Sequence, residues 1–336
     1  MAYVTVLNGV GVVVPLDRGL SEEEVISLLE RSKADCIIFE SPYADIMKKV
    51  KKSENSNLKE YICMDADLGE GFETLEEVLK RGAELLEAGN REYVDAEIDP
   101  EAMVTIVFTS GTTSASKAAM LSHRNFVSNI HDVFSIIAIY DTDVYMAFLP
   151  FHHTLGSTGL LAMLTTGAEI VFCDGLRYIQ QNLKEYQVSA FLCVPLLIES
   201  MYKKIMEEIA KQGKTKLIQT MMKSCNALTK IGVDIRRKVF KQIIDNLGGK
   251  LRFMMSGAAP LDKVVAAGYN SFGILTVQGY GLTETAPVLS GENITAIRPG
   301  SCGLPLPSVD IKIDNPNSDG VRRNSCKRTK CNDWIL

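Results

Sequence analysis

Residues 104–117 read VTIVFTSGTTSASK. The first five form an apolar run that predicts a buried strand, and eight small residues and then Lys117 follow it. We interpret the loop as a phosphate cradle, because Gly111 lets backbone N–H groups approach an anion and Lys117 neutralises its charge. It is not the Walker loop, since no glycine precedes the lysine and neither Ser nor Thr follows it. On its own, a loop of this composition is more often a flexible surface loop.

Two further strand-to-loop transitions lie downstream, at residues 254–261 (MMSGAAPL) and 277–285 (VQGYGLTET). The second holds an aromatic ring that can stack on a base, a hydroxyl and a carboxylate, from Tyr280, Thr283 and Glu284. A carboxylate beside a phosphate cradle is suited to hold a divalent cation. Taken alone, Glu284 would be a solvated loop residue; beside Thr283 and the first loop, we favour the metal interpretation.

Short β-branched runs alternate with longer amphipathic stretches along the chain. We expect strands at residues 12–14, 36–39, 61–64, 104–108, 145–149, 169–173, 190–194, 251–255 and 274–277, and helices at 72–88, 122–140, 197–209 and 234–246. Ser21 and Glu24 form a capping-box pattern that opens a further helix. The alternation predicts an α/β fold with parallel sheets, helices on both faces and ligands at the carboxyl ends of the strands.

Composition and charge narrow the class of protein. The 336 residues are 46% apolar and 23% charged, which excludes intrinsic disorder, collagen-like repeats and a small disulfide-stapled scaffold. The length allows two domains or one large α/β domain. The net charge of −5 disfavours a nucleic-acid partner, because such binders usually carry a basic face.

Cysteine usage and hydropathy bear on the compartment. The eight cysteines form no CxxC pair and have no zinc spacing with the four histidines. The first fifteen residues lack the basic residue and cleavage site of a signal peptide, and no uncharged apolar run reaches the roughly 18 residues of a spanning helix. We therefore expect a reduced, cytoplasmic protein without a transmembrane segment. Peripheral contact with a membrane and the oligomeric state stay open.

Five ordered motifs resemble those of the adenylate-forming superfamily of AMP-dependent synthetases and ligases, which includes acyl-CoA synthetases and luciferases. The motifs are Thr109–Lys117, Pro150–Gly156, Ser256–Leu261, Gln278–Thr285 and Arg298–Pro305. The phosphate loop has Ser114, Ser116 and Ala118 where Gly, Pro and Gly are usual, a pattern similar to the long-chain fatty acyl-CoA synthetase branch. The resemblance implies stacked, mostly parallel β-sheets flanked by helices, as in the large N-terminal domain of these enzymes.

The same resemblance implies a nucleotide site, position by position. The β- and γ-phosphates of ATP would contact the first loop, through Thr109, Ser110, Gly111, Thr112, Thr113 and Lys117. The backbone and side chains that would surround the adenine and the acyl group are Gly257, Ala258, Ala259, Gly279, Tyr280 and Gly281. Of these, Tyr280 would stack on adenine, and Gly257 and Gly281 would also border the substrate.

The resemblance further implies catalytic and substrate contacts. Thr283 would bond the α-phosphate and the substrate carboxylate, and Glu284 would hold Mg²⁺. His153 would face the acyl entrance, or else be a packed wall residue without proton chemistry. Thr283, Glu284 and Lys117 are the expected catalytic residues, since an anion attacks an anion here and positioning with charge neutralisation dominates such a step.

The implied reaction joins a carboxylic acid, here a fatty acid, to AMP from ATP and then to coenzyme A. Two alternatives stand beside it. One is a non-catalytic nucleotide- or acyl-binding fragment, or an inactive remnant. The other is adenylation of an amino acid or an aryl acid, with the same loops and a different pocket.

The resemblance predicts an incomplete enzyme. We expect a partial AMP-binding domain over residues 1–307, the start of a small β subdomain over 308–321 and an unrelated tail over 322–336. The family continues there with a strand similar to GEILV and with a mobile C-terminal lid domain, and Met1 opens within what resembles a family helix. Loss of one preorganised charge donor lowers a rate by about 10²–10³-fold. Because the whole lid domain would be missing here, we expect severely impaired acyl-CoA formation.

The tail suggests a shift of reading frame. Residues 322–336 contain five Lys or Arg, one acid and the single Trp. One permitted encoding of them, read one base later, gives GEILVKGPNVMIGY, which resembles the family's own continuation. We predict that sequencing the gene will show a frame change before Arg322. A downstream frame without family sequence would contradict this and leave a genuine basic tail that binds RNA or anionic lipid.

Overall fold

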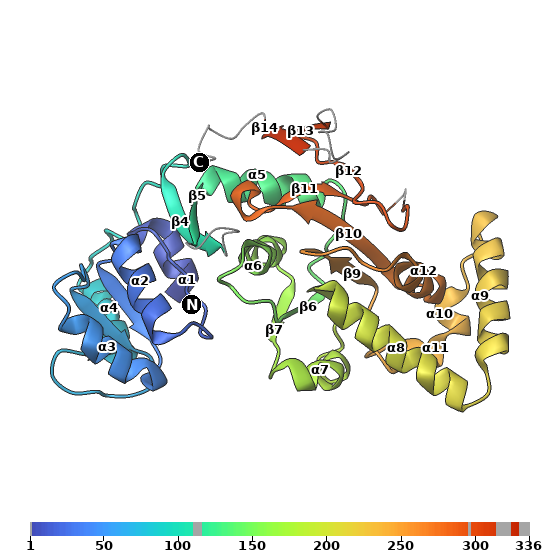
Figure 1. Ribbon diagram of the computed structural model, residues 1–336, viewed down its shortest axis with the longest axis horizontal. Coiled ribbons are helices and arrows are strands. Elements are labelled where there is room, and N and C mark those ends of the chain that lie inside the picture. Colours follow the sequence, from blue (N-terminus) through green and yellow to red (C-terminus); the bar gives the residue numbers. More distant parts are fainter. Residues whose placement is uncertain (1, 110–115, 295–296, 314–323, 329–336) are drawn as a thin grey trace. The chain divides into compact units, whose positions relative to one another are not determined.

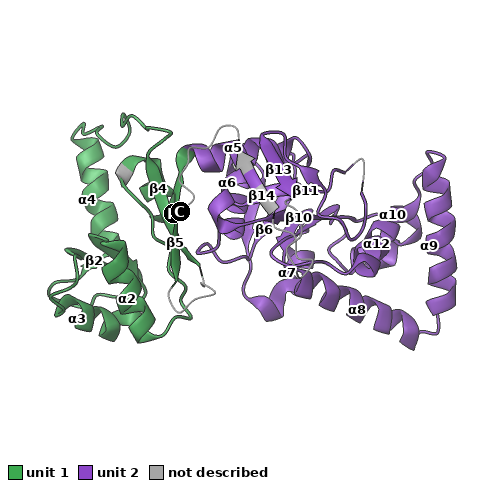
Figure 2. Ribbon diagram, turned by 45° about the horizontal axis from the view of Figure 1, so that its top comes forward, with its two compact units in different colours: residues 1–123 green, residues 124–336 purple. Residues whose placement is uncertain are grey.

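The computed structural model describes residues 2–109, 116–294, 297–313 and 324–328 (Figure 1). The chain divides into two compact units, residues 1–123 and 124–336 (Figure 2). Each unit has an apolar core of its own.

The first unit contains a three-stranded parallel sheet. Its strands, in spatial order, are β1 Cys36–Phe39, β2 Glu60–Cys63 and β3 Glu73–Thr74. Helices α2 Glu22–Ser32 and α3 Ala44–Lys51 bury Leu29 and Met47 in one cluster with Phe39 and Tyr61 of the sheet. The short helix α1 Ala2–Thr5, a π-helical turn at Val6–Val10 and helix α4 Leu75–Glu87 also belong to the unit.

Local sequence signals explain two features of this unit, the start of α2 and the lack of a strand before Pro15. The predicted capping box is confirmed: the Ser21 hydroxyl accepts from the Glu24 N–H at 3.4 Å, and the Glu24 carboxylate accepts from the Ser21 N–H at 2.9 Å. The predicted strand at residues 12–14 is wrong, because only Val13 pairs, through a single bridge to Thr105. Pro15 has no N–H to donate, so a ladder cannot continue through it.

Two paired strands flank the small-residue loop. Strand β4 Met103–Thr109 pairs antiparallel with β5 Lys117–Ser122, and Thr109 lies opposite Lys117 at the end of the ladder. Strand β5 was not expected, because alanine-containing segments have a low intrinsic preference for strands and only pairing with β4 stabilises this one. The pairing fixes both ends of the small-residue loop.

The second unit is built on a seven-stranded sheet of order β12-β11-β10-β9-β8-β6-β7. Five neighbouring strands are parallel: β10 Leu275–Gly281, β9 Phe253–Ser256, β8 Ala190–Cys193, β6 Val144–Ala147 and β7 Glu169–Phe172. Strands β11 Val288–Gly291 and β12 Leu304–Pro305 extend one edge antiparallel. The prediction of an α/β fold with mostly parallel strands is confirmed.

A separate pair of strands lies near the end of the chain. Strand β13 Val309–Ile313 pairs antiparallel with β14 Asn324–Arg328. Part of the segment interpreted as an unrelated tail thus has a regular backbone partner. Residues 322–323 and 329–336 of that segment lie outside the described residues.

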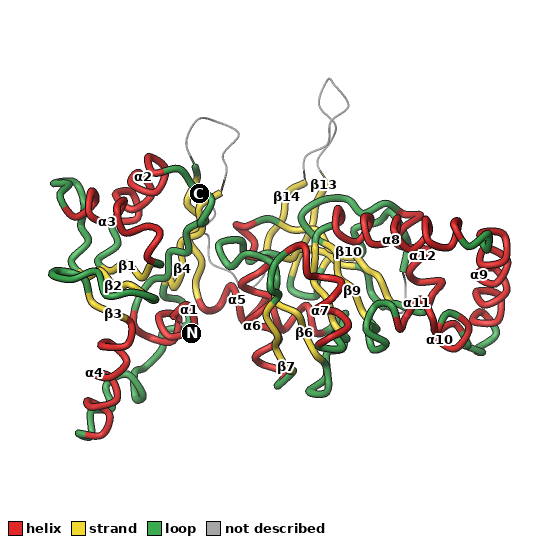
Figure 3. Tube along the Cα trace, turned by 90° about the horizontal axis from the view of Figure 1, so that it is seen from below, coloured by secondary structure: helices red, strands yellow, loops and turns green. Residues whose placement is uncertain are grey.

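Helices cover both faces of the large sheet (Figures 1 and 3). Tyr145, Leu192 and Met255 point to the face covered by α5 His123–Phe134 and α6 Thr154–Thr166. The alternate residues Met146 and Met254 point to the other face, as the two-residue period of a strand requires. The helices that share the core on that side are α7 Ile179–Glu185, α8 Pro195–Lys211, α9 Thr215–Lys230, α10 Arg236–Val239, α11 Lys241–Asp245 and α12 Lys263–Phe272. Helix α9 packs against α8, α10 and α12 and lies on the outer side of this group, away from the strands (Figure 1).

An ion pair between the buried Asp143 and the half-buried Arg252 ties together the amino ends of β6, β8 and β9. The carboxylate of Asp143 accepts from the Ser189 hydroxyl at 2.6 Å, from Nε of Arg252 at 2.8 Å and from the Tyr140 N–H at 2.9 Å. Burial disfavours the charge, but the hydrogen bonds from Arg252 and Ser189 outweigh it and lower the pKa of Asp143. Asp143 therefore stays ionised under ordinary conditions.

Two observations bear on the expected compartment. No helix in the described part of the chain is long and apolar enough to cross a bilayer. The seven cysteines of the described part are all free thiols.

We predict that Asp143→Asn lowers the free energy of unfolding by about 2 kcal/mol at neutral pH, because it leaves Arg252 without its counter-charge in a largely enclosed site. Since the pKa of folded Asp143 lies below its ordinary value of 3.8, its stabilisation is present above that pH and is lost as the pH falls through the folded pKa. Urea unfolding of the variant should therefore lose this acid dependence. Asp45→Asn, at an exposed carboxylate, is the control; equal effects of the two substitutions would contradict the prediction.

Candidate functional site

Three of the predicted loops meet at the carboxyl edge of the seven-stranded sheet. Strands β9 and β10 are parallel neighbours with Ser256 opposite Gln278, so the loops that follow them start side by side. The turn after β6 leads into α6 at the same edge. Together they enclose a cavity of about 250 Å³, the loop pocket. Among the predicted site residues, it is lined by His153, Gly257, Ala258, Gly279, Tyr280, Gly281 and Thr283.

Close backbone approach accounts for the glycines that flank Tyr280. A Cβ on Gly281 would lie 1.9 Å from the carbonyl oxygen of Pro287, which no side chain permits. A Cβ on Gly279 would lie 3.0 Å from Cε of Met255. The β10–β11 register also shifts between Tyr280 and Gly281, and such bulges re-aim neighbouring side chains. The backbone of this motif is therefore packed against the following segment, with Tyr280 on the pocket wall.

A buried carboxylate and amide hold this motif in place. Glu292 is 2% exposed, and its two carboxylate oxygens accept from the N–H groups of Gln278 and Arg298, both at 3.0 Å. The side-chain amide of Gln278 accepts from the Leu261 N–H at 3.2 Å and donates to the Ser301 carbonyl at 2.8 Å. Burial raises the pKa of Glu292 against these hydrogen bonds. One network thus joins three of the five sequence motifs.

Sequence reasoning missed Glu292. The available signal was a lone carboxylate directly after the fully buried strand Val288–Gly291. A charge at the end of a buried strand needs partners, because an unpaired buried charge is costly. Nothing in the sequence, however, identifies Gln278 and Arg298 as those partners.

The segment after β10 is fixed by backbone contacts. Thr283–Thr285 forms a single 3₁₀ turn, and the Thr285 hydroxyl lies within hydrogen-bonding distance of the Leu282 carbonyl at 2.9 Å. Asn129 of α5 donates its amide to the Val288 carbonyl at 2.7 Å. These contacts position Thr283 on the wall of the loop pocket. Of the predicted site residues of the second unit, Ala259 and Glu284 do not line the pocket.

The predicted metal ligand is compatible with Mg²⁺. The described part of the chain contains no group of three or more His, Cys, Asp or Glu side chains that could cage an ion. Mg²⁺ does not need such a cage, because it keeps several waters and is held by one or two carboxylates together with substrate phosphates. The role of Glu284 as that carboxylate stays a prediction.

His153 is the residue directly before α6. Its carbonyl accepts from the N–H groups of Gly156 at 3.0 Å and Ser157 at 3.1 Å, and its ring lies 4.3 Å from that of His152, centroid to centroid. The first turn of α6 borders the loop pocket through Thr154 and Gly156. The positive end of the helix dipole therefore favours an anion in this pocket.

The remaining predicted residues belong to the first unit. The Thr109 hydroxyl lies 3.5 Å from the Lys117 carbonyl, and the Lys117 side chain is exposed. Arg31 of α2 donates to the carbonyl of Ser116, which holds the end of the loop. The other predicted phosphate contacts, Ser110, Gly111, Thr112 and Thr113, lie outside the described residues.

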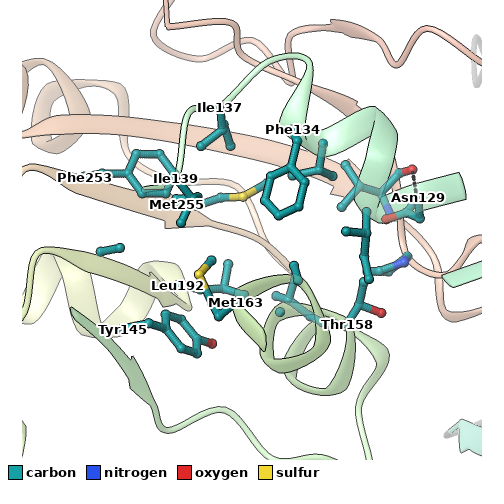
Figure 4. Close-up of a pocket in the computed structure, with 18 of the residues that line it drawn as sticks. Asn129, Phe134, Ile137, Ile139, Tyr145, Thr158, Met163, Leu192, Phe253 and Met255 are labelled. Carbon is teal, nitrogen blue, oxygen red and sulfur yellow. Dashed lines mark hydrogen bonds between the residues drawn. The ribbon is translucent and has the colours of Figure 1, made fainter. Parts of the chain in front are cut away.

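An apolar pocket adjoins the loop pocket (Figure 4). The two share the lining residues Leu155, Met255, Pro287 and Val288. Side chains from α5, the segment that follows it, α6 and the strands of the large sheet surround the apolar pocket, among them Phe134, Ile137, Met163, Leu192 and Phe253.

The polar groups of the apolar pocket are few. Asn129 is bonded to backbone carbonyls, and the Thr158 hydroxyl lies 3.5 Å from the Ala286 carbonyl. Tyr145 is 1% exposed, and burial raises the pKa of its phenol, so its hydroxyl stays protonated. The apolar pocket therefore presents hydrocarbon and no formal charge to a ligand.

Comparison with known proteins agrees with this geometry. Residues 1–325 match the protein family described as "AMP-binding enzyme". The chain is 30% identical over 298 residues to fatty acyl-CoA synthetase B of Dictyostelium discoideum, which covers 80% of this chain and 42% of that protein. It is 28% identical over 325 residues to long-chain-fatty-acid–CoA ligase 1 of Cavia porcellus, covering 90% of this chain and 46% of that protein.

A solved structure shows the same fold. The crystal structure of ATP-bound MatB from Rhodopseudomonas palustris superposes with a TM-score of 0.69 at 19% identity, covering 99% of this chain and 59% of that one. The chain spans less than half the length of the two curated relatives named above.

We predict that Gly281→Ala lowers the free energy of unfolding by about 2–3 kcal/mol, because its Cβ meets a backbone carbonyl that cannot move without displacing β11. Gly257→Ala is the matched control in the same pocket. Its Cβ would lie 2.9 Å from Cδ2 of Leu155, the end of a side chain that can rotate away, so we expect less than about 1 kcal/mol. Denaturant unfolding measures the free energy of unfolding of both variants. A larger loss for Gly257→Ala than for Gly281→Ala would contradict this explanation of Gly281.

Proposed function

Because the chain belongs to the AMP-binding enzyme family, we propose that it uses ATP to activate a carboxylic acid as an acyl adenylate, which coenzyme A then converts to a thioester. The observation that carries the proposal is the shared wall between two unlike pockets. The loop pocket offers backbone groups, hydroxyls and one aromatic ring, and the apolar pocket offers hydrocarbon. The chemistry of the two linings suits a substrate with a carboxylate head and an apolar tail. The apolar pocket has a volume of about 50 Å³, so it would take the first methylenes of the tail.

A fatty acid is the proposed acid. Each methylene of its chain transferred from water to the surroundings of Phe134, Met163 and Leu192 gains about 0.8 kcal/mol. The names of the curated relatives, fatty acyl-CoA synthetase and long-chain-fatty-acid–CoA ligase, point to the same class. An amino acid would place its ammonium group against this apolar lining, and burying an unpaired charge is strongly unfavourable.

The nucleotide would be held by the loops. The ring of Tyr280 would stack on adenine beside the backbone of residues 257–259, and base–aromatic stacking contributes about 1–3 kcal/mol. Lys117 and the hydroxyls of its loop would bind the β- and γ-phosphates. Glu284 would hold Mg²⁺, whose charge would neutralise the phosphates and favour departure of pyrophosphate.

The chemistry requires two anions to meet. An oxygen of the carboxylate forms a bond to the α-phosphorus, and the bond from that phosphorus to the β-phosphate oxygen breaks, so that pyrophosphate leaves with the electron pair. The Thr283 hydroxyl and the first turn of α6 would hold the carboxylate by hydrogen bonding and by the helix dipole. A thiolate then attacks the acyl carbon, and AMP leaves.

The test is carboxylate-dependent ATP–pyrophosphate exchange by the purified chain, across saturated fatty acids of increasing length, a benzoic acid and an amino acid. We predict exchange that requires a fatty acid and Mg²⁺. Lys117→Gln should lower the exchange rate by about 10²–10³-fold, the effect of removing one preorganised charge donor. Lys52→Gln, at an exposed lysine of the first unit, should leave the rate within about twofold.

Each other outcome has a definite meaning. Exchange with the benzoic acid or the amino acid but not with fatty acids would replace the proposed substrate. Calorimetric binding of ATP and Mg²⁺ without exchange would identify a nucleotide-binding fragment and refute the catalytic proposal for this chain. Absence of both binding and exchange would refute the proposed function entirely.

A further inference from the structure

The charged side chains of helix α9 and of the residues just before it are all positive. Residues 211–230 contain five lysines and no Asp or Glu. The enclosing segment, residues 195–252, has thirteen Lys or Arg against five Asp or Glu, although the whole chain carries −5. A cationic region set in an acidic chain produces a local positive potential and indicates an anionic partner.

The lysines of α9 share one face. Lys216, Lys223 and Lys230 recur every seven residues, close to two helical turns, so their side chains form a stripe along the helix. All three are exposed, and within the described part of the chain none of them forms an ion pair. The opposite face buries Cys225 and packs Met221 against the core. The stripe is therefore not part of the packing that stabilises the fold.

Exposed aliphatic side chains stand at both ends of the stripe. Leu217 is 57% exposed and Ile231 is 74% exposed. Ile231 directly follows the last residue of the helix, and the two residues lie about 21 Å apart along its axis, at 1.5 Å per residue. Aliphatic groups set among lysines are suited to the boundary between lipid headgroups and acyl chains, where both kinds of side chain find partners.

We propose that Lys216, Lys223 and Lys230, with Leu217 and Ile231, form a docking surface for an anionic phospholipid bilayer. The three lysines contact the phosphate and carboxylate groups of the lipid surface, and the two aliphatic side chains enter the headgroup boundary at either end of the helix. The surface lies outside both pockets described above and goes beyond the proposed reaction. Docking there would hold the chain at the bilayer, into which fatty acids partition from water.

An RNA partner fits the charge but not the side chains. Proteins that bind single-stranded RNA stack bases on aromatic rings or guanidinium groups. The stripe consists of lysines, and the large exposed hydrophobic residues of segment 195–252 are all aliphatic: Leu196, Leu217, Ile231 and Val233. We therefore favour the bilayer.

The test is co-sedimentation of the 336-residue chain with large unilamellar vesicles of phosphatidylcholine, with and without 30% phosphatidylserine. We expect binding only to the anionic vesicles, and weaker binding at 0.5 M than at 0.1 M salt, because screening shortens the range of the attraction. The triple variant Lys216→Gln/Lys223→Gln/Lys230→Gln should bind about 100-fold more weakly, at roughly fivefold per lysine. Leu217→Ser/Ile231→Ser should weaken binding about tenfold with the net charge unchanged.

A matched control removes the same charge elsewhere. Lys52, Lys80 and Lys184 are exposed lysines on other elements, and Lys52→Gln/Lys80→Gln/Lys184→Gln should change vesicle affinity by less than about threefold. Circular dichroism melting should give the same midpoint for all variants, since none of these side chains is buried.

Three results would overturn the proposal. If both triple variants weaken vesicle binding equally, net charge alone explains the binding; if the chain binds equally well to vesicles without phosphatidylserine, the anionic lipid is not its partner. If the lysines of the stripe are needed to bind a uridine oligonucleotide and the chain does not bind vesicles, the partner is RNA. The exchange assay uses dissolved acids and no vesicles, so its outcome is independent of this one.

Discussion

The close approach of Gly281 to the Pro287 carbonyl is the constraint on which both pockets depend. Because a Cβ at Gly281 would lie 1.9 Å from that oxygen, only glycine lets the chain after β10 turn back and pair as β11. The turn carries Thr283 to the wall of the loop pocket. The same return places Pro287 and Val288 between the loop pocket and the apolar pocket. One backbone contact therefore positions the polar contacts and the shared wall.

The two ends of the large sheet are built differently. At the amino ends of β6, β8 and β9, the buried Asp143 and the half-buried Arg252 form a hydrogen-bonded ion pair, which fixes the register of three strands. At the carboxyl ends, small residues leave a cavity instead of packed side chains. The division is expected in a parallel sheet, where ligands bind outside the carboxyl ends. Rigid pairing at one end allows the other end to be open without loss of strand alignment.

Much of this fold could be predicted from the sequence, since buried parallel strands appear as continuous apolar runs. Residues 36–39 were predicted with the observed bounds, and the five parallel strands of the large sheet lie within four residues of the predicted ones. The antiparallel strands β11 and β12 were not predicted. Strand β5 could not be predicted, because only its pairing with β4 defines it. Of the site, the sequence identified the loop residues but not Glu292, whose partners are 6 and 14 positions away and become neighbours only in the folded chain.

The lysine stripe of α9 illustrates how a surface can carry a function at little cost to stability. Charges seven residues apart on a helix are separated by about 10 Å, close to the Debye length in 0.1 M salt, so the lysines repel one another weakly. Toward an extended anionic surface their attractions add, because each lysine meets its own lipid groups. The apolar face of α9 packs in the same core as Met254, the strand residue two positions before Ser256 and the loop it starts. Contact at the stripe would therefore orient the loop pocket and the apolar pocket as one rigid part of the second unit.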